Sequence, residues 1–214
     1  MQSDIKIIPI FPTPVILTNI NRNFTEDELQ LLLFDIPVHK DDITLKMKNH
    51  RSKDLYLFEN YNILQNIKSF CEHCLKQYLE EIEGANTDNV NLRITQSWLN
   101  KTKPQEYHHP HNHANSYLSA ILYISCLPND GIIFKDRSLR SYDNFNFSNK
   151  KPTRWNIGSM FQNVIEGDLI IFPSWIPHQV SVNKTKDKER ISLSFNTFPI
   201  GEMGDYNEIS QLKL

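Results

Sequence analysis

The chain has 214 residues, with 23 Lys and Arg against 25 Asp and Glu, and its formal net charge is −2 at pH 7. That length fits one domain with a full hydrophobic core. Because a chain so close to neutral lacks the overall field that attracts polyanions, nucleic acid is disfavoured as a partner.

The sequence contains no signal for secretion or membrane insertion. No apolar run approaches the roughly 20 residues that span a bilayer, and the first residues combine an acid with prolines, unlike a signal peptide. Three cysteines, Cys71, Cys74 and Cys126, are too few and too unevenly placed for a disulfide framework. We therefore expect a cytoplasmic protein with no membrane partner.

The N-terminal part, residues 1–89, predicts short extended pieces followed by helices. Prolines interrupt residues 5–20, as is common at sheet edges. Asn23 or Thr25 can cap a helix through TEDELQLLLFDI. Between residues 55 and 83, apolar side chains recur every three or four positions, which predicts an amphipathic helix that ends near Gly84.

Cys71 and Cys74 form a C-x-x-C pair, which suggests zinc or redox chemistry. Both lie on the apolar stripe of the predicted helix, and no second pair completes a tetrahedral site. We interpret them as small buried hydrophobic residues.

From residue 90 the sequence changes to short runs of β-branched and aromatic residues separated by turn formers. Helices followed by strands, without alternation, predict an antiparallel sandwich or barrel with helices on one side. We expect one domain over residues 1–214, with a β core over 90–200 and a tail over 201–214. The expected strands are NLRITQSWLNKT, SYLSAILYIS, GIIFKD, DLIIFPSW, HQVSVN and ERISLSFNTF.

Residues 136–160 form a long polar insertion among these strands. Such a segment is either a solvated loop or a lid over a site, and a solvated loop is favoured. Its Lys and Arg side chains could face an acidic partner in the second case.

Four of the eight histidines lie in the stretch QEYHHPHNH, which could be a metal site, a proton relay or a polar loop. Residues i and i+2 of an extended segment share a face, so His111 and His113 can converge on one ion. His178 follows the apolar strand DLIIF, 65 residues after His113 (178 − 113 = 65). Three imidazoles from two strand ends make a facial ligand set with open positions opposite.

Arg190 opens the strand ERISLSFN and shares one face with Ser192 and Ser194. An arginine that points inward needs an anion, and a planar carboxylate is its best partner. The alternative is a surface arginine in the charged turn KTKDKER.

The order and spacing of these pieces, over residues 98–198, resemble the Fe(II)/2-oxoglutarate-dependent oxygenases of the prolyl-hydroxylase-like branch. The resemblance is strongest to a small bacterial and phage group with H-x-H in place of H-x-D. It implies a double-stranded β-helix, that is, a cupin-like jelly roll with supporting helices, in a bacterial or phage-infected cell.

Carried over by position, the resemblance makes His111 and His178 the two histidine ligands of Fe(II), with Arg190 and Ser192 binding the distal carboxylate of 2-oxoglutarate. Tyr123 lies where family members add a hydroxyl to that carboxylate, although packed core is the plainer interpretation of a strand tyrosine. Ascorbate is a candidate reductant.

The departure from the family lies at His113, which stands where a carboxylate ligand is usual. We expect a working three-histidine site. A carboxylate from elsewhere (Glu106, Asp130 or Asp136) and a protein without turnover are the alternatives. His108 and His109 would be solvated by default, or line the entrance of the site.

The implied activity is that of a dioxygenase that hydroxylates a protein side chain or a small molecule. Two other classes remain open. One is a cupin-like isomerase or hydrolase with zinc or manganese at the same histidines, and the other is a non-catalytic metal-binding or structural jelly roll.

Overall fold

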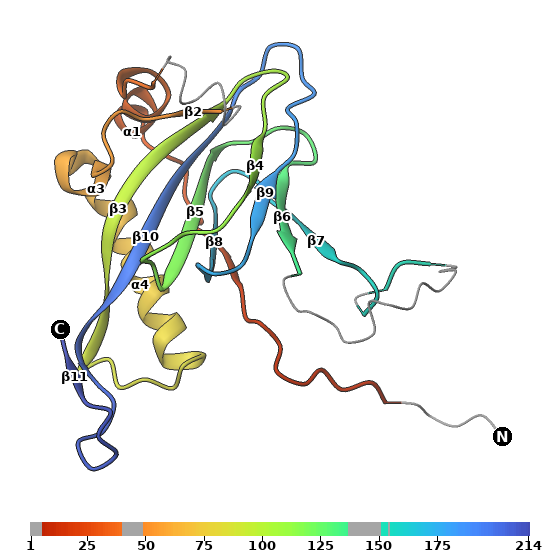
Figure 1. Cartoon of the computed structure of the whole chain (residues 1–214). Helices are drawn as coiled ribbons and strands as arrows, with labels where there is room; N and C mark the ends of the chain where they lie inside the picture. Colours follow the sequence, from red (N-terminus) through yellow and green to blue (C-terminus); the bar gives the residue numbers. More distant parts are fainter. Residues whose placement is uncertain (1–5, 40–48, 137–150, 154) are drawn as a thin grey trace.

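The computed structural model describes residues 6–39, 49–136, 151–153 and 155–214. Two antiparallel sheets face each other, and helices cover the outer face of the larger sheet (Figure 1). The predicted arrangement of an antiparallel β core with helices on one side is confirmed.

The larger sheet has seven strands in the order β1-β8-β5-β10-β3-β2, and β11 pairs with the far end of β10. All its pairings are antiparallel. The strands are β1 (Ile16–Asn19), β2 (His50–Arg51), β3 (Val90–Thr102), β5 (Leu118–Ser125), β8 (Asp168–Pro173), β10 (Arg190–Met203) and β11 (Leu212–Lys213).

The smaller sheet has four strands in the order β4-β9-β6-β7. They are β4 (His108–His111), β6 (Gly131–Lys135), β7 (Ser159–Asn163) and β9 (His178–Val180). β7 begins in the last two residues of the predicted polar insertion (136–160) and continues beyond it, while residues 137–150 and 154 of that insertion are outside the described residues. The choice between a lid and a solvated loop therefore concerns residues that mostly lie outside the described ranges.

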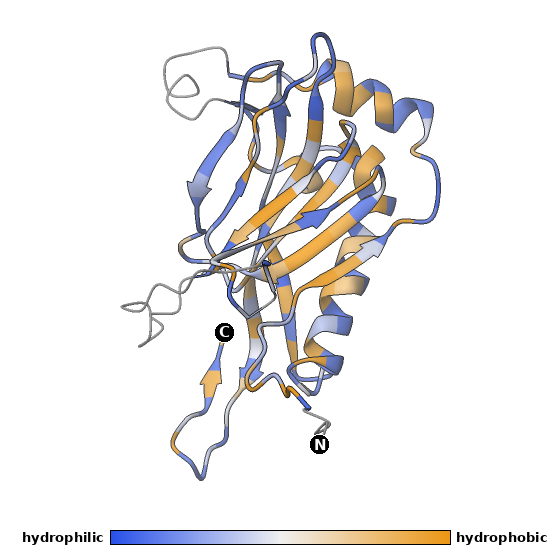
Figure 2. Cartoon of the chain, turned by 90° about the vertical axis from the view of Figure 1, so that its right-hand side faces the viewer, coloured by the Kyte–Doolittle hydropathy of each residue, from blue (hydrophilic) through white to orange (hydrophobic). Residues whose placement is uncertain are grey.

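Alternation along the strands of the larger sheet sends side chains to two different cores. One face contributes residues such as Leu99, Leu122 and Leu193 to a core shared with the helices, where the rings of Phe58 and Phe195 lie 5.8 Å apart. The other face contributes Ile121, Tyr123, Ile170 and Phe172 to a core shared with β6. Figure 2 shows the hydrophobic residues concentrated on these strands and on the helices behind them.

The first helices are α1 (Glu26–Gln30) and the π-helical turn η1 (Leu31–Asp35). Thr25 is the N-cap of α1, because its hydroxyl accepts from the backbone of Glu28 while the Glu28 carboxylate accepts from the backbone of Thr25. Arg22 donates two hydrogen bonds to that carboxylate, at 2.7 and 2.8 Å. Of the two predicted caps, Thr25 is the one that is used.

The predicted long helix is divided into α3 (Leu57–Asn60), a 3-10 turn η2 (Asn62–Leu64) and α4 (Gln65–Glu81). Tyr61 has extended backbone angles at the division. Asn60 and Asn62 flank it, and asparagine disfavours helix interiors because its side chain competes for backbone hydrogen bonds. Gly84 follows α4 with a left-handed φ of 63°, as its predicted place at the helix end requires.

Cys71 and Cys74 lie on the inner face of α4, with 0% and 3% of their surface exposed, and all three cysteines are free. Burial raises the pKa of Cys71 and raises that of Cys74 to about 11, so both thiols stay protonated. Their interpretation as core residues is confirmed. Across the described ranges, no helix is both long and apolar enough to cross a membrane.

Candidate metal and co-substrate site

Three histidines converge between the two sheets. His111 ends β4 and His178 begins β9, and the two residues are direct partners in the antiparallel register. His113 follows β4 by two residues and is fixed by a hydrogen bond from its backbone N–H to the carbonyl of Ser174, at 3.0 Å. One ring nitrogen from each histidine lies within 4.8 Å of the other two. The predicted convergence is thus present.

Backbone carbonyls orient two of the three rings. Nδ1 of His111 lies 2.9 Å from the carbonyl of His109, and Nδ1 of His178 lies 3.1 Å from the carbonyl of Ile176. A carbonyl only accepts, so each Nδ1 carries the proton and each Nε2 presents its lone pair. This is how metal-binding imidazoles are held in one tautomer.

The spacing of the nitrogens fits a single ion. Nε2 of His113 and Nε2 of His178 are 3.4 Å apart. Two imidazole nitrogens about 2.1 Å from one divalent ion are separated by about 3.0 Å at a right angle and about 3.4 Å at a tetrahedral angle. Only small movements would be needed to place both nitrogens on one ion.

Burial keeps these imidazoles neutral, which is the form that binds metal. Loss of hydration, followed by repulsion from His111, lowers the pKa of His113 to about 4. The same two causes lower the pKa of His178 to about 3, and burial lowers the pKa of His111. At neutral pH all three imidazoles are therefore uncharged.

His108 and His109 are not solvated, contrary to the default expectation. The ring of His108 stacks on that of His111 with centroids 4.2 Å apart, and burial lowers its pKa to about 2. Nδ1 of His109 is buried without a hydrogen-bond partner. Because His108 pairs with Val180 on β9, the His108 side chain points inward. This strand pairing was not predicted, since His108 was expected to lie in a loop.

No carboxylate joins the cluster within the described ranges, since its members are the three histidines alone. Both oxygens of Glu106 are engaged, one by His50 at 2.8 Å and the other by the backbone of Lys103 at 2.8 Å. Asp130 binds Arg190, as set out below, and Asp136 is absent from the cluster.

The predicted co-substrate residues lie on the sheet face that points toward the histidines. Ser192 pairs with Tyr123 on one side and with Asn100 on the other, so these side chains share a face. Tyr123 is 1% exposed, and its hydroxyl has no hydrogen-bond partner. Tyr123, Ser192, Arg190 and the three histidines line one cavity.

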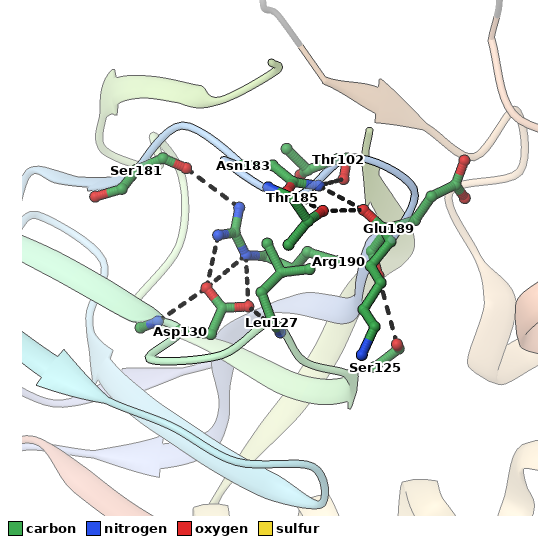
Figure 3. Close-up of polar contacts among 11 residues, drawn as sticks. Thr102, Ser125, Leu127, Asp130, Ser181, Asn183, Thr185, Glu189 and Arg190 are labelled. Atoms are coloured by element: carbon green, nitrogen blue, oxygen red, sulfur yellow. Dashed lines mark hydrogen bonds and ion pairs between the residues drawn. The ribbon is translucent and has the colours of Figure 1, made fainter. Parts of the chain in front are cut away.

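Arg190 points inward, as predicted, but it already has an anionic partner. Its Nε donates to both oxygens of Asp130, at 2.7 and 2.8 Å, and its Nη2 lies 2.6 Å from Oδ1 (Figure 3). Nη1 donates to the carbonyl of Ser181 at 3.3 Å. Since a guanidinium carries five N–H groups, Nη1 and Nη2 each keep a second donor.

This role of Asp130 was not predicted from the sequence, where Asp130 was expected only as a possible substitute metal ligand. No local pattern links Asp130 to an arginine 60 residues away. The only sequence signal is the turn PNDG, which places an acid just before β6.

The residues present fit both groups that the resemblance implies. Ring nitrogens of all three histidines lie within 4.8 Å of one another, and the Nε2 lone pairs of His111 and His178 are free for a divalent ion. A buried hydroxyl without a partner, a serine hydroxyl and the outer edge of a fixed guanidinium meet in the same cavity, which suits a carboxylate.

A family model matches the part of the chain that contains this site. Residues 96–196 match the sequence model of the 2OG-Fe(II) oxygenase family described as "Putative 2OG-Fe(II) oxygenase". That range contains all three histidines, Tyr123, Arg190 and Ser192. No curated protein matched the chain.

Several solved structures share the fold at low sequence identity. The epimerase SnoN from nogalamycin biosynthesis has a TM-score of 0.59 at 12% identity, covering 88% of this chain and 79% of its own. HygX from Streptomyces hygroscopicus, with nickel, 2-oxoglutarate and hygromycin B bound, has a TM-score of 0.53 at 11% identity, covering 86% and 82%. A prolyl-4-hydroxylase from Pseudomonas putida has a TM-score of 0.52 at 12% identity, covering 87% and 94%.

These likenesses confirm the predicted jelly-roll fold. The family model covers the region that supplies every predicted site residue. Residues 96–196 thus match the model of the 2OG-Fe(II) oxygenases, a family of enzymes that use Fe(II) and 2-oxoglutarate, and the chain shares its fold with the solved structures named above.

Proposed function

We propose that this chain is an Fe(II)- and 2-oxoglutarate-dependent dioxygenase that hydroxylates a protein side chain or a small molecule. One observation carries the proposal. Three imidazole lone pairs converge in the same cavity as Tyr123, Ser192 and the free edge of Arg190. A protein that only bound a metal ion would not require Tyr123, Ser192 and Arg190 beside the histidines.

His111, His113 and His178 are the proposed metal ligands, and three protein ligands would leave coordination positions of a divalent ion for other groups. When bound, iron and 2-oxoglutarate supply the oxygen-dependent chemistry, with succinate and CO2 as the products of the co-substrate. The chain holds the rings of His111 and His178 in one tautomer and places the cavity between the two sheets.

Arg190, Ser192 and Tyr123 are the proposed partners of the distal carboxylate. Asp130 fixes the guanidinium through Nε and one N–H of Nη2, so the remaining N–H groups of Nη1 and Nη2 have a defined direction. A pre-oriented donor pair binds a carboxylate with little loss of side-chain entropy. Asp130 is thus the positioning residue of this subsite.

His113 replaces the usual carboxylate ligand in this proposal. A neutral imidazole leaves more positive charge on the metal than a carboxylate does, and this favours a dianionic co-substrate. With Glu106 and Asp130 both engaged elsewhere, neither is available as a substitute ligand.

The proposal treats residues 1–214 as one oxygenase domain. A single core cluster supports this, because it joins helical residues such as Leu32 and Leu75 to strand residues such as Leu193. Three free cysteines support a reducing, cytoplasmic compartment. Ascorbate as reductant belongs to the same proposal.

The test is an anaerobic titration of the metal-free protein with Fe(II) and 2-oxoglutarate, followed by visible spectroscopy. We expect a metal-to-ligand charge-transfer band for the wild type and none for His178→Ala. Arg190→Gln should need at least tenfold more 2-oxoglutarate, since it loses a charged pair of hydrogen bonds. His113→Asp should keep the band, because it restores the ligand set common in the family.

Two results would contradict the proposal. Tight zinc binding with no iron–2-oxoglutarate band would indicate a cupin-like isomerase or hydrolase. A normal band without succinate formation, in the presence or absence of substrate mixtures, would indicate a metal-binding protein without turnover.

A further inference from the structure

A second cavity adjoins the histidine cluster and the first cavity. It shares Trp98, His108, His111 and His113 with the first cavity, so it opens toward the same metal position. It lacks Arg190, Ser192 and Tyr123, and contains Arg51 instead. An anionic co-substrate held by Arg190 would leave this second space for another molecule.

The position of Arg51 follows from the sheet register. Arg51 on β2 pairs with Asn100 on β3, Asn100 pairs with Ser192 on β10, and Ser192 pairs with Tyr123 on β5. Directly paired residues point to the same face, so all four side chains face the interior of the jelly roll. Neighbouring strands are about 4.8 Å apart, so the Arg51 backbone lies about 10 Å from that of Ser192.

Among the described residues, the buried Nε of Arg51 has no hydrogen-bond partner, and none of the ion pairs includes Arg51. The inward-facing Arg190, by contrast, is paired with Asp130. A partly buried cation without an anion is unfavourable, and a planar guanidinium is suited to a carboxylate or phosphate.

The other groups around Arg51 are neutral. Within the part of the chain that the structure describes, no Asp or Glu lines this cavity. The side-chain amides of Asn49, Gln96 and Asn112 do line it, together with Trp98, whose ring stacks near His113 with centroids 5.8 Å apart. Such a lining suits a polar molecule with one negative group and disfavours a cationic one.

We propose that Arg51 binds an oxyanion of the primary substrate, a carboxylate or a phosphate, and so holds the substrate beside the metal. The inference rests on the proposed function for the identity of the neighbouring metal and co-substrate. It adds that the substrate is an anion. The amides of the cavity complete its polar surroundings.

The test measures binding of inorganic phosphate and of acetate to the full-length protein. Calorimetry on the metal-free protein should give a binding event that Arg51→Gln weakens at least tenfold, separate from any binding at Arg190. The matched control is Arg93→Gln, on the exposed side of β3, and it should bind as the wild type does. Tighter binding of phosphate would indicate a phosphorylated substrate, and tighter binding of acetate a carboxylic acid.

A second measurement locates the anion. With Mn(II) and saturating 2-oxoglutarate bound, the phosphate phosphorus and acetate methyl resonances should broaden in the wild type and in Arg93→Gln, but much less in Arg51→Gln. Equal broadening in all three proteins would overturn the inference, as would failure of both anions to bind. Displacement of the anion by 2-oxoglutarate would also overturn it, because Arg51 would then serve the co-substrate.

The two proposals fail separately. If Arg51-dependent anion binding persists in a protein that takes up neither Mn(II) nor Fe(II), the subsite is supported and the dioxygenase proposal is wrong. If the iron–2-oxoglutarate band forms and anion binding does not depend on Arg51, the dioxygenase proposal is supported and the anionic substrate is wrong.

Discussion

Asp130→Asn removes the charge that faces Arg190 and keeps the shape of the side chain. Asp130 and Arg190 are 3% and 5% exposed, and their contacts are 2.6 to 2.8 Å long. The Asp130 oxygens also accept from the backbone of Leu127 and Gly131, at 3.1 and 3.0 Å. The substitution therefore leaves a buried cation facing an amide group.

Breaking a buried ion pair by removing one partner destabilises a protein by about 3–5 kcal/mol. For a domain of this size, each kcal/mol lowers the melting temperature by roughly 2–4 °C. We therefore expect Asp130→Asn to unfold about 6–20 °C below the wild type. Circular dichroism melts of the metal-free protein, with urea titrations to obtain the free energy of unfolding, measure the change.

The double variant Asp130→Asn/Arg190→Gln separates stability from positioning. With both charges removed, no unpaired ion is buried, so we expect it to regain stability relative to Asp130→Asn. It should not regain affinity for 2-oxoglutarate. A free energy of unfolding for Asp130→Asn within about 0.5 kcal/mol of the wild type would refute the reasoning.

Three further predictions concern the metal, the core and the first helix. Metal at 100 times its Kd should stabilise the wild type by about 2.7 kcal/mol, measured as a melting shift, and His178→Ala should lose most of that shift. Leu193→Ala, at a fully buried position in the helix-side core, should lower the free energy of unfolding by about 2–5 kcal/mol in urea titrations. Burial raises the pKa of the Glu28 carboxyl, but hydrogen bonds from Arg22 and Thr25 outweigh this effect and lower it. The ionised Glu28 therefore stabilises the fold above the pKa that it has in the unfolded chain. This stabilisation is lost as the pH falls through its pKa in the folded protein. Glu28→Gln should accordingly cost about 1–3 kcal/mol at pH 7, with the difference from wild type shrinking below about pH 4.

The sequence predicted the parts of the site that depend on strand alternation and on strand ends. Arg190 and Ser192 face inward because residues two apart share a face, and His178 follows an apolar strand that is easily recognised. The partner strand of each histidine, however, is a long-range property. The register that aligns His111 with His178 joins segments 67 residues apart (178 − 111 = 67) and leaves no local pattern.

Two missed elements show the same limit. β7 is a mostly exposed edge strand, so its sequence lacks apolar alternation, and no strand was predicted over these residues. β2 is two residues long, too short for any periodic signal, yet it brings Arg51 into the row with Asn100 and Ser192. Short strands contribute little hydrophobic burial, and their place is fixed by the neighbouring strand.

The charges of the interior explain why a third histidine and an unpaired arginine occur together. In the proposed complex, Fe(II) with three neutral imidazoles carries two positive charges, which a 2-oxoglutarate dianion balances. Arg190 is balanced by Asp130, and this leaves Arg51 as the uncompensated cation among the described residues that line the two cavities. With a carboxylate in place of His113, the metal, its ligands and 2-oxoglutarate would together carry a negative charge, and this charge would repel an anionic substrate. With His113 in that place, the metal and co-substrate are neutral together, and the same substrate meets only the attraction of Arg51.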